Sequence, residues 1–226
     1  ESMMTIEDTL EMKLPRIYPD KDITSVLIDD HYTAQMAIRD ALRLETKFLW
    51  NAEARGREIE RILETASTGC CCWTTIHCEN TWNIPDRMVQ MAGGDADKEA
   101  VENDCFTFFD VGIKVKKTQD EGGIHRHIDQ LCVFDRTDNT NHSVVLFRDG
   151  MYTGRAMPKE LRHRLFVNGE KETLDLFQEM SEKIRREKTR EKENKPNYTP
   201  NFKKDIQQKY EDSKPYPESI KGTNRH

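Results

Sequence analysis

Long apolar stretches are absent from this 226-residue sequence. No run approaches the roughly 18 to 20 apolar residues that a membrane-spanning helix requires. The first residues also lack the basic-then-apolar pattern of a secretory signal. We therefore expect a chain that does not enter the membrane and that works inside the cell.

An excess of positive charge and a regular cysteine framework are missing as well. The chain has 35 Lys and Arg against 41 Asp and Glu, a formal net charge of -6. This balance argues against a protein whose whole surface binds nucleic acid. Three of the six cysteines are adjacent, at positions 70–72, which is not the spacing of a small disulfide-bonded domain. We expect reduced thiols.

Three runs between Cys105 and Gly150 are rich in β-branched and aromatic residues. Turn residues bound each run, at positions 119–123, 138–141 and 149–150, so we predict three sequential strands in an antiparallel meander. Successive strand side chains point to opposite faces. Asp110 should therefore lie in mid-strand, on the same face as Lys114 and Lys116.

Helices are expected on both sides of this sheet. Apolar residues at steps of three and four predict a helix from Asp29 or Asp30 through Ala52, with further helices over 57–66, from Pro158 and around Phe177. The predicted fold class is α+β, with a mixed or antiparallel sheet of three or more strands and helices at both ends. We divide the chain into an irregular lead-in (1–28), an α+β core domain (29–185) and a polar, basic C-terminal extension (186–226).

The segment 70–82 concentrates cysteines and tryptophans and reads CCCWTTIHCENTW. One interpretation is a zinc-stabilised binding module, whose ligands would be Cys70, Cys72, His77 and Cys78. A closed zinc site normally shows two ligand pairs, and only one uneven cluster is present here. We favour a buried strand or turn, in which free thiols serve as small apolar residues.

The C-terminal extension changes the charge balance of the chain. From Ser181 onward there are 13 Lys and Arg against 8 Asp and Glu. A charge run is usually a solvated face, so we favour a tail that lies along the chain's own acidic domain. The alternative is a non-catalytic interaction domain, whose basic Pro/Tyr-containing tail binds protein or RNA. Four residues would then contact nucleic acid: Arg185, Arg186, Lys188 and Arg190.

His31, Asp86 and Asp110 are the candidate metal ligands. Two acids and a histidine in one place can hold one or two divalent cations, which activate water and stabilise a phosphoryl transition state. Each also has an ordinary structural interpretation. His31 could cap a helix, Asp86 could be a turn acid, and Asp110 could pair with a cation on its own or a neighbouring strand.

In order along the chain, Asp30-His31-Tyr32, Ile84-Pro85-Asp86 and Phe109-Asp110-Val111 resemble motifs of a known family. That family is the cap-snatching endonuclease domains, of the PD-(D/E)xK kind, of segmented negative-strand RNA virus polymerases. The resemblance implies a metal-dependent RNA endonuclease domain, or an inactive relative of it. It also implies RNA and other polymerase regions or subunits as partners, and the cytoplasm or nucleus of a host cell as the location.

The same resemblance implies a set of site residues. Manganese or magnesium would be bound by His31, Asp86, Asp110 and the carbonyl of Val111, and Glu79 or Glu64 would add a carboxylate. The catalytic lysine is displaced, since position 112 is glycine. Lys114 is the candidate for that role. It would lie roughly 13 Å along the strand from Asp110, unless a bulge at Gly112 shortens the path.

Overall fold

The computed structural model describes residues 1–120 and 122–193. The chain divides into two compact units, residues 1–184 and 185–226. The second unit is described only over residues 185–193, which belong to the last helix, α7 (Lys171–Glu193). Every element before α7 lies in the first unit.

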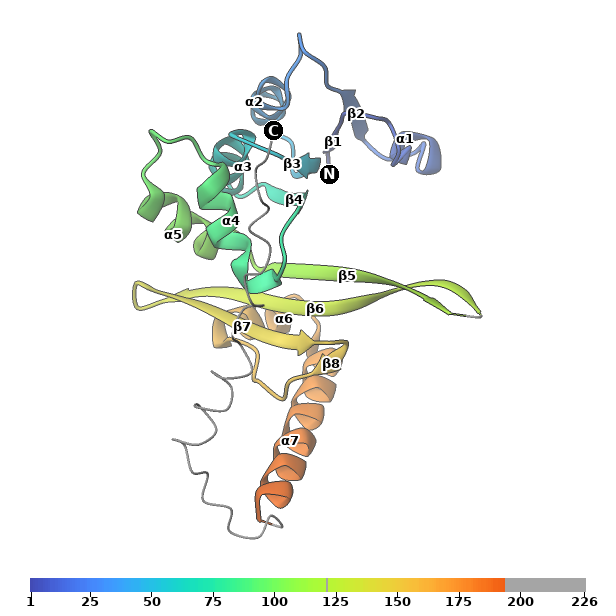
Figure 1. The fold of residues 1–226 in the computed structure, drawn as a ribbon. Helices are drawn as coiled ribbons and strands as arrows, with labels where there is room; N and C mark the ends of the chain where they lie inside the picture. Colours follow the sequence, from blue (N-terminus) through green and yellow to red (C-terminus); the bar gives the residue numbers. More distant parts are fainter. Residues whose placement is uncertain (121, 194–226) are drawn as a thin grey trace, which may run out of the picture. The chain divides into compact units, whose positions relative to one another are not determined.

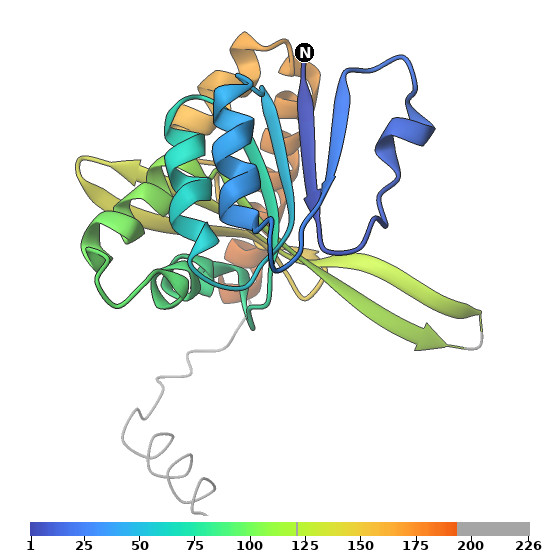
Figure 2. The same cartoon turned by 90° about the horizontal axis from the view of Figure 1, so that it is seen from above.

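The first half of this unit contains a parallel sheet of four strands, in the order β2-β1-β3-β4. Helices α2 and α3 cover one face of it (Figures 1 and 2). The elements are β1 (Met3–Glu7), α1 (Leu14–Ile17), β2 (Ile23–Leu27), α2 (Ala34–Arg43), β3 (Phe48–Ala54), α3 (Glu58–Ser67) and β4 (Cys71–Ile76).

Apolar side chains on the covered face form the main core. Ile6, Ile38, Leu49 and Ile59 are each at most 1% exposed, and alternation along β1 turns Thr5 and Glu7 to the other face of the sheet. Parallel strands linked by helices bury their covered face in this way.

The second half contains an antiparallel sheet in the order β5-β6-β7-β8. Phe106, Cys132 and Phe134 form a smaller core, against which Trp82 and Ile84 pack. The elements are η1 (Thr81–Asn83), α4 (Ile84–Met91), α5 (Lys98–Phe108), β5 (Val111–Asp120), β6 (Gly123–Thr137), β7 (Thr140–Arg148), β8 (Met151–Tyr152) and α6 (Lys159–Val167).

The predicted α+β class is confirmed, and β5, β6 and β7 form the expected antiparallel meander. The start of the first strand was wrong, because residues 105–108 are the last turn of α5. The side chain of Asp97 caps that helix by accepting hydrogen bonds from Glu99 N and Ala100 N. Asp110 therefore precedes β5 and does not lie in mid-strand.

The long helix predicted from Asp29 or Asp30 to Ala52 was also wrong. It is split into α2, capped by Thr33, and the strand β3. Glu45 breaks the helix by adopting a positive φ of 51°. Residues 1–28, expected to be irregular, contain β1 and β2. The helices predicted over 57–66 and from Pro158 are present as α3 and α6.

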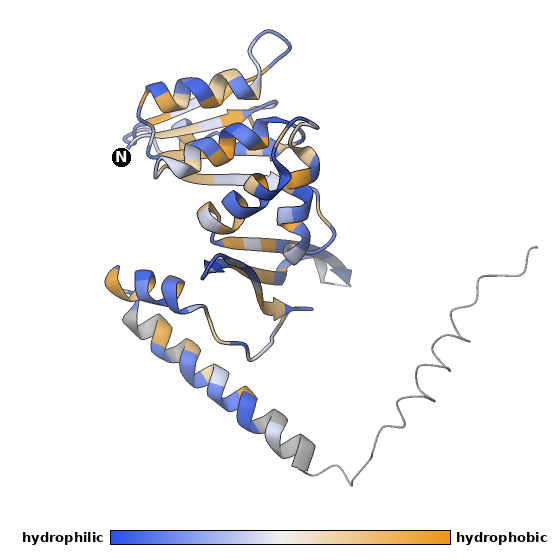
Figure 3. Cartoon of the chain, turned by 90° about the vertical axis from the view of Figure 1, so that its left-hand side faces the viewer, coloured by the Kyte–Doolittle hydropathy of each residue, from blue (hydrophilic) through white to orange (hydrophobic). Residues whose placement is uncertain are grey.

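Apolar and polar residues alternate along the helices and strands (Figure 3). Across the part of the chain that the structure describes, no helix has the length and apolar character needed to cross a membrane.

Candidate functional site

The carboxyl ends of the four parallel strands meet at one edge of their sheet, and polar side chains gather there. β1 ends at Glu7 and is followed by Asp8, while Glu53 lies near the end of β3 and Arg55 follows that strand. His77 comes directly after β4. Ligands of open α/β sheets bind at this edge. We call these five residues, Glu7, Asp8, Glu53, Arg55 and His77, the polar edge.

Arg55 connects two acids of the polar edge. Its Nη2 lies 2.7 Å from Glu53 Oε2, and its Nη1 lies 3.0 Å from Asp8 Oδ2. On the other side of Glu53, His77 Nε2 lies 3.2 Å from Oε1. The side chains of Glu53, Arg55 and His77 are 26%, 63% and 92% exposed. Charged groups of both signs are thus held together and remain accessible to a ligand.

These contacts shift the pKa values of Glu53 and Arg55. The hydrogen bond from Arg55 lowers the pKa of Glu53, against a smaller opposing effect of desolvation, and the charges of Arg55 and His77 lower it further. The same hydrogen bond raises the pKa of Arg55. Glu53 is therefore an ionised hydrogen-bond acceptor at neutral pH.

Glu7 is the buried member of the polar edge, with 1% of its surface exposed. Its Oε2 accepts hydrogen bonds from the backbone N–H groups of Glu11 and Met12, each at 2.9 Å. Its Oε1 accepts one from Thr5 Oγ1 at 3.1 Å. These bonds satisfy a buried carboxylate and fix the loop that follows β1, which includes Asp8.

A second carboxylate fixes the turn after β3. Glu58 Oε1 accepts hydrogen bonds from the backbone N–H groups of Arg55 and Gly56, the latter at 2.9 Å. Glu58 is the first residue of α3, so this side chain joins the start of the helix to backbone amides of the turn that precedes it. The backbone of Arg55 is held in place as a result.

The predicted metal ligands are not brought together. In the described residues, no group of three or more His, Cys, Asp and Glu side chains could hold a metal ion. His31 lies in the loop before α2, where its backbone N–H donates to Asp29 Oδ1, and Asp86 lies in the first turn of α4. The predicted manganese or magnesium site of His31, Asp86 and Asp110 is therefore absent.

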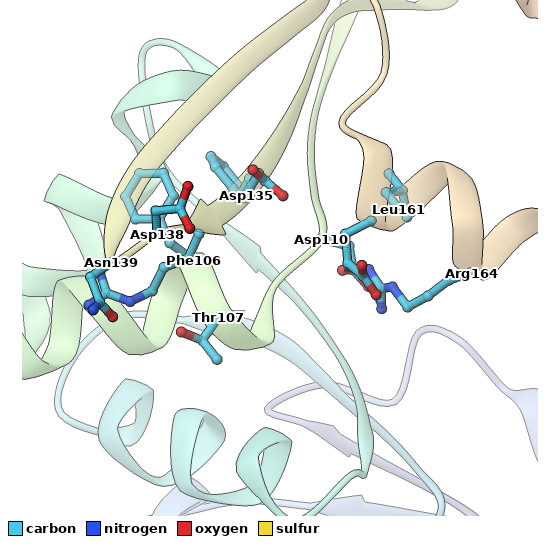
Figure 4. Close-up of a pocket in the computed structure, with 11 residues that line it drawn as sticks. Phe106, Thr107, Asp110, Asp135, Asp138, Asn139, Leu161 and Arg164 are labelled. Atoms are coloured by element: carbon cyan, nitrogen blue, oxygen red, sulfur yellow. Dashed lines mark hydrogen bonds and ion pairs between the residues drawn. The ribbon is translucent and has the colours of Figure 1, made fainter.

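Asp110 faces Arg164 of α6 (Figure 4), and the two side chains form a bidentate ion pair. The pairing raises the pKa of Arg164. A groove of about 600 Å³ surrounds the pair, and its lining includes Phe106, Asp135 and Asp138. This groove is larger than the groove of about 340 Å³ that His77 lines, but the ion pair of Asp110 and Arg164 ties α6 to the residue before β5.

The other residues of the nuclease prediction have structural contacts. Lys114 Nζ donates to the backbone carbonyl of Glu79, and Val111 is the exposed first residue of β5. The strand irregularity lies at Lys114 and Val115, where the pairing with β6 shifts register. Gly112, the position at which a bulge would have shortened the path to Asp110, pairs regularly with Cys132.

The favoured interpretation of segment 70–82 as a strand is confirmed by β4. Burial raises the pKa of Cys70 and of Cys72, and the latter thiol donates to Ile62 O at 3.8 Å. Cys78 donates to Asn80 O at 3.2 Å. The raised pKa values of Cys70 and Cys72 disfavour the thiolate that zinc requires, and His77 faces Glu53. The described residues therefore form no zinc site in this segment.

The predicted nucleic-acid contacts lie at the end of the described chain. Arg185 and Arg186 are exposed residues of α7. The side chains of Lys188 and Arg190, and all of residues 194–226, lie outside the described residues.

Sequence reasoning missed four members of the polar edge, Glu7, Asp8, Glu53 and Arg55, and considered His77 only as a zinc ligand. The available signal was the position of Glu7 and Glu53 at the ends of short apolar runs, MMTIED and FLWNAEARG. Acids in that position are typical of parallel strands that end at a site.

Comparison with known proteins assigns most of the chain to one family. Residues 1–214 match the protein family described as type II/IV secretion system protein. A Bacillus anthracis protein described as uncharacterized is 30% identical over 114 residues, which cover 50% of this chain and 26% of that protein.

Two solved structures share the fold. The VirB11 ATPase of the Brucella suis type IV secretion system, in complex with sulphate, has a TM-score of 0.50 and 23% identity, over 58% of this chain and 39% of that chain. The Yersinia pseudotuberculosis ATPase DotB has a TM-score of 0.51 and 17% identity, over 82% of this chain and 41% of that chain. The chain thus spans well under half the length of these proteins.

These matches overturn the resemblance to cap-snatching endonucleases. That resemblance depended on three short pieces, whereas the family match extends over residues 1–214. The RNA endonuclease function was wrong with it. The viral polymerase partners and the host-cell location, which only the resemblance implied, lose their support. The two alternatives, an RNA or protein interaction domain with a basic tail and a zinc-stabilised module, are overturned by the same match.

Proposed function

Because the chain belongs to the type II/IV secretion system protein family, we propose that the polar edge forms one side of a nucleoside triphosphate hydrolysis site. The observation that carries the proposal is the contact of Glu53 with both Arg55 and His77 at the carboxyl ends of parallel strands. This is the edge where an open α/β sheet binds nucleotides. Two structures with the same fold are of proteins named as ATPases.

The polar edge has the donors that Mg²⁺ and a triphosphate require. Mg²⁺ is usually bound by one or two carboxylates together with substrate phosphates, and not by a cage made only of protein groups. Glu53 and Asp8 provide accessible carboxylates. Asp8, whose side chain is half exposed, would provide a carboxylate ligand to Mg²⁺. The absence of a three-ligand cluster in the described residues is compatible with this type of site.

Bound Mg²⁺ would neutralise phosphate charge and polarise the bond that is broken. Glu53, ionised because Arg55 lowers its pKa, would accept a hydrogen bond from the attacking water and orient it. Arg55 would exchange one carboxylate partner for a phosphate oxygen, since guanidinium binds both in a planar, bidentate manner. His77 would hold Glu53 in place from the opposite side.

Residues 1–226 contain no G-x-x-x-x-G-K-[ST] motif, whose backbone amides cradle phosphates in P-loop proteins. The polar edge would therefore supply the carboxylates, the arginine and the histidine, and a phosphate loop would be supplied by other polypeptide. Without that loop, we expect the chain to bind Mg·ATP weakly, with a Kd of roughly millimolar.

An NMR titration tests this proposal. Mg·ATP is added to the chain and the shifts of Glu53, Arg55 and His77 are followed, with Mg²⁺ plus adenosine as the ligand control. We expect saturable shifts at these residues with Mg·ATP alone, and their loss in Arg55→Ala. Arg43→Ala is the matched control, because Arg43 is an exposed arginine on α2 whose acidic partner is Asp40. No shifts, or the same shifts in Arg55→Ala, would reject the proposal.

A further inference from the structure

The hairpin of β5 and β6 extends beyond the strand that pairs with it. β7 pairs with β6 only over residues 131–137, whereas β5 pairs with β6 as far as the turn at Asp120 and Gly123. Residues 115–120 and 123–128 therefore pair only with each other within the described chain, and we call them the ribbon. Figures 1 and 2 show the ribbon reaching away from α4 and α5.

Solvent surrounds the ribbon on both faces. Residues 115–120 and 124–128 are all exposed, so the ribbon has no buried core of its own. An isolated two-stranded hairpin is only marginally stable in water. A partner that covered one face would bury apolar side chains and stabilise the ribbon.

One face of the ribbon continues the apolar ladder of the sheet. Residues opposite each other in an antiparallel pair lie on the same face, and alternate residues of a strand return to it. Along this face the successive rungs are Val111–Val133, Ile113–Leu131 and Val115–Ile128. Val133 is 1% exposed, but Val115 and Ile128 are 60% and 46% exposed. The apolar ladder thus extends from the packed body into solvent.

Two cations lie opposite each other on the same face. The next rungs are Lys117–Arg126 and Gln119–Ile124, and Ile124 is 51% exposed. Like charges directly opposite each other destabilise a sheet. On the other face, Lys116 Nζ lies 3.7 Å from Asp129 Oδ1, but Lys117 and Arg126 form no ion pair with a described residue. An acidic group placed between these two cations would remove their repulsion.

The chemistry of this face favours a protein over a lipid surface or a nucleic acid. Residues 115–128 contain no Phe, Trp or Tyr, so the ribbon offers no aromatic ring to stack on bases or to anchor in a membrane interface. At the tip, the side chain of Asp120 is 68% exposed, and anionic lipid or phosphate would repel its charge. An acidic side chain flanked by apolar ones matches the face instead.

The spacing of the rungs matches that of a helix. Successive residues on one face of a strand are about 6.6 Å apart, and four residues of an α-helix rise about 6 Å. We propose that this face, the docking face, binds an amphipathic helix of another protein, in which an acidic residue has apolar residues three or four positions before and after it. The acid lies between Lys117 and Arg126, and the apolar residues cover Val115, Ile128 and Ile124. Amphipathic helices bind partners through residues at such steps.

Selection from a displayed helix library tests the docking face. Peptides that differ only on one helix face are selected on the immobilised chain, and each enriched peptide is then titrated against variants of the chain. No polar-edge residue belongs to the ribbon, so the titrations need no nucleotide. We expect enriched peptides to carry Asp or Glu between apolar residues, and Lys117→Glu to weaken their binding at least about tenfold.

Two further variants show which face is used. Thr118→Glu adds an acid to the other face of the ribbon and should leave binding unchanged. Val115→Ser removes an exposed apolar side chain from the docking face and should weaken binding. Lys117→Glu places opposite charges across the ribbon, which stabilises a strand pair, so amides in 115–120 should exchange no faster than in the parent. Loss of binding is thereby separated from loss of the hairpin.

Three other occupants are measured on the same variants. They are vesicles of phosphatidylcholine with phosphatidylserine, a DNA duplex, and a second copy of the chain followed by sedimentation. We expect none of them to depend on Lys117. Binding of any of the three that Lys117→Glu abolishes would overturn the helix as the occupant, and so would the absence of an acid-bearing peptide that depends on Lys117.

Discussion

His77 Nε2 lies 3.2 Å from Glu53 Oε1, although one residue follows β4 and the other belongs to β3. The parallel pairing of these strands, with Ala54 beside Ile76, brings the two side chains to the same edge. Their contact explains why His77 is no zinc ligand here: its ring nitrogen is directed at a carboxylate and not at the thiols of Cys70 and Cys72.

Arg55→Gln should raise the pKa of Glu53. Arg55 is the main cause of its lowering, so the variant should titrate closer to the ordinary value of 4.5. A lowered native pKa contributes stability above the unfolded value, and this stability is lost as pH falls through the native pKa. The stability difference between parent and variant should therefore be present at pH 6 and shrink below about pH 4.5.

Carboxyl-carbon NMR titration measures this pKa directly. Asp95 is the internal control, because its pKa is lowered by its own backbone and by Arg57, not by Arg55. An unchanged titration of Glu53 in Arg55→Gln would contradict the ion pair.

Buried cysteines should react with thiol reagents more slowly than exposed cysteines. Burial raises the pKa of Cys105 to about 12 and of Cys132 to about 11, so few of these thiols are ionised at pH 8, and only the thiolate reacts. Cys71 is exposed. With a chromogenic disulfide reagent at pH 8, we expect Cys71 to react first, and Cys105 and Cys132 to react only on unfolding. Mass spectrometry of peptides identifies the order, and early labelling of Cys105 would show that its core is open.

Gly112→Ala should destabilise the chain by about 1–3 kcal/mol. A Cβ at this position would lie 2.7 Å from Ile84 Cδ1 and 3.1 Å from Phe134 Cζ. Phe134 is a buried core residue and Ile84 is partly buried against the same core, so at least one of them must shift. Gly94→Ala is the matched control, since nothing lies within 4 Å of its Cβ position, and we expect it to be neutral or slightly stabilising. Denaturant unfolding measures both, and equal midpoints would contradict the packing of β5 on α4.

Glu58→Ala should lower stability by about 0.5–1.5 kcal/mol, the net contribution of a typical hydrogen bond. It removes the acceptor for the backbone N–H groups of Arg55 and Gly56. Glu64→Ala, on the same helix, removes only a surface pair with Arg61 and should cost less than about 0.5 kcal/mol. Thermal unfolding compares the two, and a smaller loss for Glu58→Ala would reject its role in fixing the turn after β3.

Local patterns predicted a good part of the fold. The steps of Ile59, Ile62 and Leu63 predicted α3, because helix periodicity puts all three on one buried face. Turn residues between apolar runs predicted the meander of β5, β6 and β7. The same patterns failed where one apolar run contains both a helix and a strand. Phe48 and Leu49 continue the helical spacing of α2, but they belong to β3.

The residues of the candidate site could not be grouped correctly from the sequence. His31, Asp86 and Asp110 were grouped by their order along the chain, but order does not determine distance, and Asp110 pairs instead with Arg164. Glu7 and Glu53 meet the same edge only because β1 and β3 are parallel neighbours. Nothing local in the sequence specifies which strands are adjacent.

The sequence by itself determined the α+β class, the reduced cysteines and the helices α3 and α6, because periodicity and composition act over a few neighbouring residues. The tertiary structure alone decided the order β2-β1-β3-β4 and the gathering of Glu53, Arg55 and His77. These features depend on contacts between distant segments, where burial of a shared core selects one pairing of strands out of many.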